Sequence, residues 1–478
     1  MSLLSAFNNA RSSLAVTSQQ SAVVSRNMAN ASDPTATRKF ANQVYDRNGA
    51  VDILSVSQSS DPALYRSMIN GQAAVGTNET VATALDRVRQ IIGDVDAQTS
   101  PSASIAAMKN ALTDLAASPE NAHYQRAAVD AARDLALNLN NATDAIQTMR
   151  KDADTELANG AKRLNQLLGD LETLNAKVVS GTVGGKDVTD EMDQRDRIVA
   201  EISGYVGVNV RVRANNDLVL STDSGIVMFE NRARSVEFTP TQAFDPEKRA
   251  GGAKGAPGEF KIDGISIGGS SSMAVREGSL VAALKLRDDI GNEFQDRIDQ
   301  IGTTLVEHTF AEQKTAADGT VTTVPGLFER TGPGTISISQ RVDYRLPGGD
   351  AARIRDGGIA DATYTYNTDG ESGFSGRINE LVARFDDNLT FANGEVGRLS
   401  DFSSGSMAWF EGVRGTAREN ASYQTTMVAR AREVLSSTTG INIEEEMTHL
   451  LDLERSYQAS SKLIQTVNSM FDSLLAIR

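Results

Sequence analysis

The stretch NMANASDPTATRK, residues 27–39, ends a helix-patterned segment that begins almost at Met1. A proline pushes the residue before it out of the helical region, so Asp33-Pro34 predicts the end of this helix. Alternating steps of four and three residues indicate a seam on one helix face. The seam is thin, since Ala, Thr and Ser hold about half of its positions, which are Leu3, Phe7, Ala10, Leu14, Thr17, Ser21, Val24, Met28 and Ala31.

The other end of the chain has the same character. Residues 441–478 contain neither Gly nor Pro and predict one long helix with Asn442 as its N-cap. Glu444 to Glu446 then lie in the first turn, where the helix dipole favours acids. The same four-and-three spacing predicts a second seam of Ile443, Met447, Leu450, Glu454, Tyr457, Ser461, Ile464, Asn468, Phe471 and Leu475.

The two ends carry opposite charge. Residues 1–47 have five basic and two acidic groups, net +3, whereas residues 441–478 have six acids and three bases, net −3. Exposed ion pairs contribute only about 0–1 kcal/mol each, but opposite charge favours pairing. We therefore predict an antiparallel helix pair, with two unrelated solvated helices as the alternative.

The interior is first helical. One amphipathic face is predicted by Val81, Leu85, Val88, Ile92 and Val95, and a second by Ile105, Met108, Leu112 and Leu115. Ser118-Pro119-Glu120 is typical of an N-cap followed by proline at the first helical position. A long bundle helix is then predicted by the apolar residues Leu135, Leu139, Ala142, Ile146, Met149, Ala153, Leu157, Leu164, Leu168, Leu171 and Val178.

Near residue 205 the apolar period changes from that of a helix to that of a strand. Val206, Val208, Val210 and Val212 alternate with other residues, and a turn at 214–217 predicts a hairpin. EFKIDGISIG (259–268) continues the strand pattern beyond a Gly-, Lys- and Pro-containing loop at 248–258. Helix returns over 280–305, TISIS and ATYTY mark a second β-patterned stretch within 317–372, and helices close the chain near 374–388 and 406–438.

The fold class is therefore mainly α with β-rich insertions, in a nested multi-domain plan. We expect a terminal coiled-coil-like assembly domain from 1–47 plus 441–478. A helical domain is expected from 48–205, 277–316 and 373–440. Residues 206–276 and 317–372 form a β-rich outer region of small β domains.

Composition narrows the classes of function. The 478 residues suffice for two to four domains. A net charge of −15 argues against nucleic-acid binding, and the absence of cysteine excludes thiolate catalysis and disulfides. No run approaches the roughly 20 apolar residues of a membrane span, and the N-terminus lacks the pattern of a cleaved signal peptide.

The search for chemistry predicts no catalytic residue, cofactor or metal. The three histidines, His123, His308 and His449, lie far apart in the sequence, and His308 fits a satisfied helix-end residue. GTVGGKD (181–187) has the wrong spacing for a phosphate loop and is interpreted as a turn. TYNTDG (365–370) lacks the glutamate of a calcium loop and is interpreted as a hairpin turn. EMDQRDRIVAEI (191–202) is interpreted as a solvated or salt-bridged helix start.

The termini resemble the bacterial flagellar rod, hook and hook-associated proteins, which form the axial protein family. Asn27, Met28, Ala29, Asn30, Pro34 and Arg38 fit the N-terminal signature of that family, whereas Thr35-Ala36 departs from its Gly-aromatic pair. The acidic cluster, Met447 and Tyr457-Gln458-Ala459 are similar to its C-terminal helix. Residues 115–142, 164–175 and 190–203 resemble the members that join hook and filament.

The resemblance implies an extracellular structural protein of the flagellum, without enzymatic activity. It implies export through the flagellar type III system without a cleaved signal, and a homo-oligomeric ring of about eleven subunits at the hook–filament junction. The implied partners are the hook protein, the second junction protein and an export chaperone on the C-terminal helix. Neither nucleic acid nor membrane insertion is implied.

We expect the terminal seams to form the assembly interface. An isolated helix is only marginally stable in water, and the burial of Ala, Ser and Thr contributes little stabilising free energy. We therefore expect the ends to be largely disordered in the free monomer and to pair on assembly. The interface residues predicted are Leu3, Phe7, Leu14, Val24, Met28, Asn30, Met447, Leu450, Tyr457, Ile464, Phe471 and Leu475.

Three other functions stay open at this point. Another axial protein, such as hook, distal rod or a flagellin-like protein, would share the same termini. An enzyme built on the β insertions and a cytosolic coiled-coil adaptor are the remaining alternatives.

Overall fold

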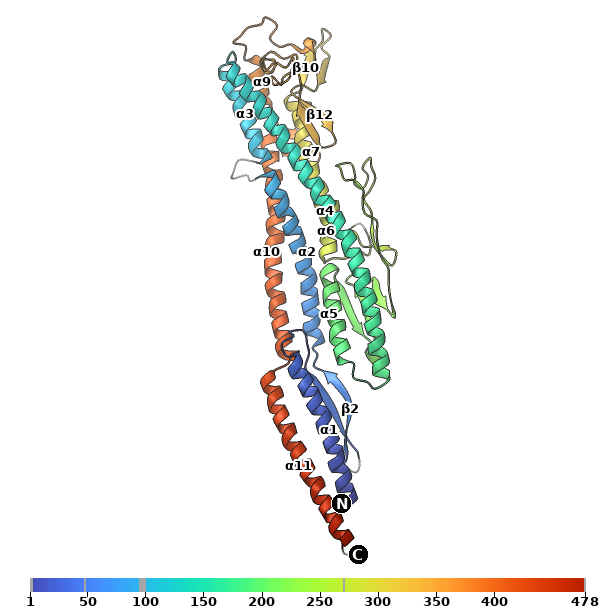
Figure 1. Cartoon of the computed structure of the whole chain (residues 1–478). Coiled ribbons are helices and arrows are strands. Elements are labelled where there is room, and N and C mark those ends of the chain that lie inside the picture. Colours follow the sequence, from blue (N-terminus) through green and yellow to red (C-terminus); the bar gives the residue numbers. More distant parts are fainter. Residues whose placement is uncertain (1–2, 47–48, 94–99, 270, 477–478) are drawn as a thin grey trace.

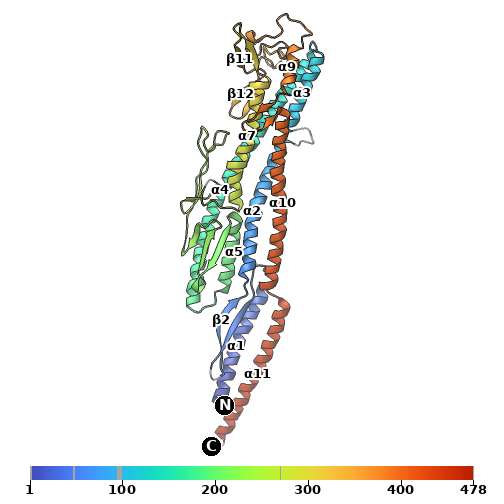
Figure 2. The same ribbon diagram turned by 180° about the vertical axis from the view of Figure 1, so that it is seen from behind.

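The computed structural model describes residues 3–46, 49–93, 100–269 and 271–476. The molecule is long and narrow, and both termini lie at the same end (Figure 1). Two units follow one another along its length. A thin terminal unit contains the two chain ends, and a longer helical unit carries the β-rich segments (Figures 1 and 2).

The terminal unit is the predicted antiparallel helix pair with a hairpin added. α1 (Leu3–Asn30) ends just before Asp33-Pro34, and α11 (Ile443–Ala476) begins after Asn442, as predicted. Asn442 caps α11, because its side-chain oxygen accepts a hydrogen bond of 3.0 Å from the backbone N–H of Glu444. The boundary that was predicted at residue 47 falls inside a hairpin of β1 (Lys39–Tyr45) and β2 (Val51–Gln58), which packs on α1.

Long helices build the second unit, and they lie nearly parallel to the long axis (Figure 1). α4 (Ala122–Val183) is the longest, at about 93 Å. α2 and α10 pack against each other along most of their length. Two π-helical turns, η2 (Leu286–Ile290) and η3 (Leu305–Thr309), continue α6 and α7 as one helical run. The helices are α2 (Pro62–Ile92), α3 (Pro101–Ala117), α5 (Thr189–Tyr205), α6 (Ser279–Lys285), α7 (Gly291–Thr304), α8 (Arg353–Asp356), α9 (Gly376–Arg384) and α10 (Leu399–Thr439).

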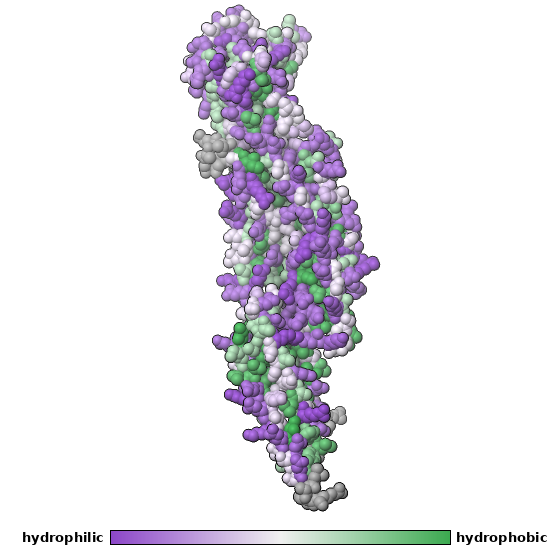
Figure 3. Space-filling view, in the orientation of Figure 1, coloured by the Kyte–Doolittle hydropathy of each residue, from purple (hydrophilic) through white to green (hydrophobic). Residues whose placement is uncertain are grey.

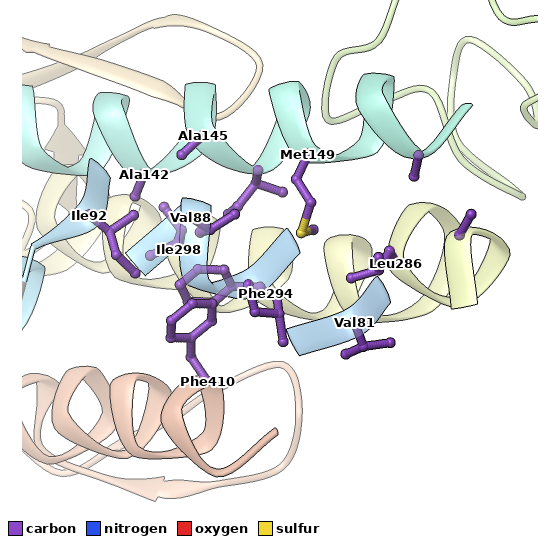
Figure 4. Packing of buried hydrophobic residues seen from close by; sticks show 14 of the residues in the cluster. Val81, Val88, Ile92, Ala142, Ala145, Met149, Leu286, Phe294, Ile298 and Phe410 are labelled. Carbon is purple, nitrogen blue, oxygen red and sulfur yellow. The ribbon is translucent and has the colours of Figure 1, made fainter. Parts of the chain in front are cut away.

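The predicted apolar faces form the core of this unit. Val81, Leu85, Val88 and Ile92 are buried, and so is every apolar position predicted for the long helix between 135 and 178. Val95 lies outside the described residues. Phe294 of α7 stacks on Phe410 of α10 with ring centroids 4.8 Å apart (Figure 4). Within the described residues, the contiguous apolar cluster includes none of the residues in α1, β1, β2 or α11.

The first β-rich segment lies beside α4, and the second reaches the end of the molecule farthest from the termini (Figure 1). Arg150 of α4 holds the first segment, because its side chain donates to the carbonyl oxygens of Asp245 (3.1 Å) and Lys248 (2.5 Å). One sheet has the order β3-β4-β5-β6 and another the order β7-β8-β9, and the described residues also form four two-stranded sheets. The strands are β3 (Val208–Val212), β4 (Leu218–Thr222), β5 (Val227–Glu230), β6 (Arg232–Ala233), β7 (Val236–Phe238), β8 (Phe260–Ile262), β9 (Ile265–Ser266), β10 (Glu312–Thr315), β11 (Val321–Val324), β12 (Phe328–Gly332), β13 (Thr335–Ile338), β14 (Leu389–Thr390) and β15 (Val396–Gly397).

Three local predictions are wrong. Ser118 ends α3 instead of capping the next helix, since Asn121 accepts a 2.9 Å hydrogen bond from the N–H of His123 and caps α4. ATYTY contains a 3₁₀ turn, η4 (Ala362–Tyr364), where a strand was expected. TYNTDG is a turn but joins no hairpin, because Asn367 bonds to Glu371 across it. Short polar side chains bind their own backbone in both caps and turns, which makes the two hard to tell apart.

Candidate assembly interface

The helix pair meets along the predicted thin seam. On α1, Val24 is buried, and Phe7, Leu14, Met28 and Asn30 are half-buried. On α11, Leu450, Ile464 and Phe471 are half-buried. Midway along the pair, the hydroxyls of Ser13 and Ser460 lie 3.0 Å apart. The side chains of Leu3 and Leu475 lie outside the described part of the chain.

Part of the α11 seam was predicted one residue out of register. Met447 and Tyr457 are 52 % and 50 % exposed, and Glu454 and Asn468 are exposed as well. The residue just before each of Met447, Glu454 and Asn468 faces α1 instead. These inward residues are Glu446, Leu453 and Val467. Glu446 was assigned to the helix dipole, so its burial gave no signal in the sequence.

A polar cluster fixes the pair where it meets the helical unit. Glu446 is 1 % exposed and accepts hydrogen bonds from Asn27 Nδ2 (3.0 Å) and Arg38 Nε (2.7 Å). Asn27 also bonds the backbone of Lys39 in both directions, at 2.8 and 3.0 Å. The N–H of Arg38 donates to Thr439 O at 2.8 Å, which ties β1 to the end of α10. We call these residues, with Lys39 and Asp193, the neck clasp.

The second half of the neck clasp joins the hairpin to α5. Lys39 Nζ is buried and forms an ion pair with Asp193, and it lies 3.3 Å from Asp190. Asp193 also accepts from the hydroxyl (2.6 Å) and the N–H (3.2 Å) of Thr37. A buried charge needs such partners, because an unpaired one is strongly destabilising. The stretch 191–202 therefore works as a salt-bridged helix start, as interpreted from the sequence.

Arg26 and Asp33 extend this contact across the neck. Arg26 lies 2.8 Å from Asp187, and Arg197 lies 3.3 Å from Asp33. Burial opposes ionisation of Asp187, but hydrogen bonds from Thr189 and Arg26 outweigh it and lower the pKa of this carboxyl. Hydrogen bonds from Thr35 lower the pKa of Asp33. Both carboxylates therefore stay charged at neutral pH.

The sequence contained only partial signals for these clasp residues. Asn27 and Arg38 belong to the N-terminal motif, and Asp193 is one of several carboxylates in the stretch 191–202. That they meet depends on α5, whose Asp193 lies 154 residues from Lys39 in the sequence.

Apolar side chains remain exposed on the terminal unit. Half of the large apolar side chains that are exposed in the described part of the chain lie on α1, β1, β2 and α11, which hold about one sixth of the residues. Figure 3 shows apolar surface on both flanks of the lower part of the molecule. These residues are Leu4, Phe40, Val44, Tyr45, Leu54, Ile443, Met447, Leu451, Tyr457, Leu463 and Met470.

The other candidate sites have structural explanations. His308 Nε2 lies 2.9 Å from Asp387 Oδ2, so this histidine has a partner. GTVGGKD contains the last three residues of α4, and the predicted turn follows at 184–185. Among the described residues, no group of His, Cys, Asp and Glu is arranged to hold a metal ion. Within that same part of the chain, no helix is long and apolar enough to span a membrane.

An elongated chain whose two ends pair at one tip, with apolar surface left open around that pair, is typical of a structural protein. The comparisons with known proteins agree with this class. The model of the flagellar hook-associated protein FlgK helical domain matches residues 85–322, and that of the flagellar basal body rod FlgEFG protein C-terminal region matches residues 434–477. The chain therefore belongs to the FlgK family of flagellar hook-associated proteins.

Individual relatives are distant in sequence. The chain is 19 % identical to flagellar hook-associated protein 1 of Salmonella typhimurium, over 80 % of this chain and 82 % of the relative. It is also 19 % identical to the Escherichia coli K12 protein of the same name, over 69 % and 72 %. The structure of the flagellar hook junction protein FlgK from Burkholderia pseudomallei superposes with a TM-score of 0.54. That match has 12 % identity and covers 78 % of this chain and all of the other.

Proposed function

We propose that this chain is the structural subunit of the junction between hook and filament, and that it enables the filament to assemble on the hook. Family membership supports this proposal. Copies of the chain pack into a ring of about eleven subunits, with heterologous contacts between neighbours. We infer a structural role and no catalytic one.

The observation that carries the proposal is the open apolar surface of the terminal unit. A monomeric protein rarely leaves so much apolar surface on so few residues, and such patches mark interaction sites. Met447, Leu451 and Tyr457 are each at least half exposed although they lie on a helix that is already paired. Their burial between subunits would supply the stability that the thin α1–α11 seam lacks.

We assign the assembly interface to both faces of this pair. The inward seam residues, such as Val24 and Ile464, hold α1 to α11, and the outward residues Met447 and Tyr457 contact neighbouring subunits. The seam is half Ala, Ser and Thr, so the pair orders on assembly and is largely disordered in the free monomer. The three-unit division of the chain belongs to this proposal, with the β1–β2 hairpin assigned to the terminal unit.

The flanking partners follow from the position at the junction. The hook protein lies on one side of the ring and the second junction protein on the other. An export chaperone covers the apolar face of α11 before the chain leaves the cell through the flagellar type III system.

A gene deletion tests the function. Loss of the chain leaves hooks without filaments and releases flagellin into the medium, and plasmid-borne wild type restores filaments. Labelled chain appears as one short band between hook and filament in micrographs. Filaments that assemble normally in the deletion strain would overturn the proposal.

Two variants of α11 test the interface. Met447→Ser changes an exposed residue and lowers filament number without lowering the free energy of unfolding of the monomer's helical unit. Leu453→Ala changes a buried residue of the same helix and also loosens the α1–α11 pair. Normal filament number in Met447→Ser would remove Met447 from the interface.

Hydrogen exchange on dilute monomer tests the ordering. Residues 5–30 and 445–475 exchange quickly in the monomer and slowly in isolated flagella. Strong protection of both segments in the dilute monomer would contradict it.

A further inference from the structure

The β1–β2 hairpin turns one face away from α1. Alternate side chains of a strand point the same way, so Phe40, Asn42 and Val44 share this face. Phe40 and Val44 are 46 % and 44 % exposed. Asp52 pairs with Val44 across the ladder and therefore lies on the same face, at the end of the hairpin that is farther from the neck. We call these four residues the hairpin face.

The polar group in the middle of the hairpin face already has partners. Asn42 Nδ2 donates to the hydroxyls of Ser55 (3.1 Å) and Ser57 (2.7 Å) of β2. Buried polar groups need hydrogen bonds, and another surface can cover this amide nitrogen without leaving it unpaired. The hairpin face is thus apolar near the neck, self-satisfied in the middle and acidic near its turn.

α11 has a stripe of exposed residues on the side that faces away from α1. Leu451 and Arg455 lie two residues on either side of the buried Leu453, which is more than half a turn round the helix. Steps of four, four, three and four residues connect Met447, Leu451, Arg455, Gln458 and Lys462, which we call the α11 stripe. The stripe is apolar near the neck and basic further down. Arg455 lies 3.5 Å from Asp452 on the exposed surface, and within the described residues Lys462 forms no ion pair.

Two sets of contacts place the hairpin and α11 at matching heights. At the neck, Asn27 bonds to the starts of both β1 and α11. Further down, the N–H of Val51 donates to Ser12 Oγ at 3.2 Å, and the next residue of α1, Ser13, lies 3.0 Å from Ser460. The turn end of the hairpin is therefore level with Ser460.

The two patterns are in register along the molecule. We count from these contacts with a rise of about 3.3 Å per strand residue and about 1.5 Å per helix residue. Phe40 is then level with Leu451, and Asp52 lies between the heights of Arg455 and Lys462. The apolar parts of the hairpin face and the α11 stripe thus share one height, and the acidic and basic parts share another.

The two surfaces lie on different flanks of the terminal unit. α1 lies between the hairpin and α11 in both views (Figures 1 and 2), and apolar surface is open on both flanks (Figure 3). The hairpin face and the α11 stripe both point away from α1, so they meet only when a second copy of the chain is present. Rotation about the axis of a closed ring keeps equivalent residues at equal height, which preserves the register between neighbours.

We propose that the hairpin face of one copy packs on the α11 stripe of the next copy, with Phe40 on Leu451 and Asp52 facing Arg455 and Lys462. Complementary charge fixes the register of such contacts, and the apolar residues are removed from water. The contact is heterologous, because two different surfaces meet, and it repeats around a ring. This inference rests on the proposed junction function and names the surface that the outward residues of α11 meet.

A charge exchange tests the contact in cells that lack the chromosomal copy. Lys462→Glu places like charges together and lowers the number of filaments per cell by about tenfold. Asp52→Lys alone lowers it as well, and the double variant Asp52→Lys/Lys462→Glu recovers most of the loss. Recovery through the hairpin separates this contact from an effect on the export chaperone. Ser456→Glu is the control, since Ser456 is exposed on α11 but lies off the stripe, and it leaves filament number unchanged.

Disulfides show whether the contact joins two copies, because the natural chain has no cysteine. Val44 and Gln458 lie at nearly equal heights on the two surfaces. Val44→Cys/Gln458→Cys forms a ladder of disulfide-linked oligomers in isolated flagella. Cells that express the two single variants side by side form linked dimers only, and either single variant alone forms none.

Normal filament number in Lys462→Glu, no recovery in the double variant, or linkage confined to single chains would overturn the contact between hairpin and α11. If wild-type chain is absent from the junction, the proposed function fails. If it is present there and the charge exchange has no effect, only this contact fails.

Discussion

Asn27 and Glu446 lie 419 positions apart in the chain and are joined by a hydrogen bond of 3.0 Å, with each residue only 1 % exposed. The bond links the end of α1 to the start of α11. It lies where the thin terminal unit meets the helical unit, so the two chain ends are held together at the neck by polar groups.

Removal of the Glu446 carboxylate should weaken this junction. Glu446→Ala leaves Arg38 without its 2.7 Å acceptor, and we expect a loss of about 1.5–3 kcal/mol in the stability of the α1–α11 pair. Glu445→Gln is the control, since Glu445 contacts the same arginine at 3.3 Å but is 60 % exposed, and it should cost about 0–1 kcal/mol. Hydrogen exchange of α11 in assembled flagella measures the loss of stability in both variants. Equal losses would contradict the role assigned to the burial of Glu446.

The buried ion pair of Lys39 and Asp193 should behave as a coupled unit. Lys39→Met leaves a buried carboxylate without its cation and should destabilise the contact by about 3–5 kcal/mol. The double variant Lys39→Met/Asp193→Asn should recover much of that loss, because neither charge then remains. Urea unfolding of the wild type, Lys39→Met, Asp193→Asn and the double variant gives the coupling energy. Additive losses would show that the two groups act independently.

Two helix glycines should respond in opposite directions to alanine. A Cβ at Gly76 would lie 2.5 Å from Gly204 O and 3.2 Å from Ser279 N, so Gly76→Ala should cost about 1–3 kcal/mol by overpacking. Gly169 in α4 has no atom within 4 Å of its Cβ position, and Gly169→Ala should stabilise by about 0.4–1 kcal/mol. Thermal unfolding compares the two, and a stable Gly76→Ala variant would contradict the close approach of α2 to α5.

Asp196 should make stability fall with pH in the weakly acidic range. Burial raises its pKa to about 6, against the opposing charge of Arg195, whereas the carboxyl in the unfolded chain titrates near 3.8. Between these values the folded chain binds more protons than the unfolded chain, so the free energy of unfolding decreases as pH rises from 3.8 to 6. Asp196→Asn removes this contribution and should be more stable than wild type at pH 7. Parallel pH profiles of the two proteins would contradict the raised pKa.

Apolar spacing predicted most of the fold. The long helices follow directly from it, because positions such as Leu135 and Leu164 must all face one core. The antiparallel pairing of the ends also followed, from a matching seam and opposite charge. Strand β3 was predicted where Val alternates with other residues, whereas the β1–β2 hairpin was not predicted. ATYTY failed because alternation over five residues does not separate a strand from a turn.

The neck clasp could not be predicted from local patterns. Glu446 takes a core position that an apolar-spacing rule gives to Met447, because Asn27 and Arg38 satisfy its carboxylate. With Glu446 in that position, the start of α11 is rotated about its axis by one residue position. Met447 is therefore exposed. Asp193 likewise gains its role only when Lys39 is brought to it by the hairpin. The spacing of residues describes one element at a time, whereas these contacts form only when three elements come together.

The neck also has a mechanical consequence. Apolar contacts are non-directional and let two surfaces slide, whereas hydrogen bonds weaken steeply once their angles change. A turning load on the chain ends therefore meets firm resistance at Asn27, Lys39 and Glu446 until the bonds break together. Because hydrogen bonds require particular distances and angles, they re-form in the same alignment. The neck clasp therefore resists rotation of the terminal unit relative to the helical unit up to the load at which its hydrogen bonds break.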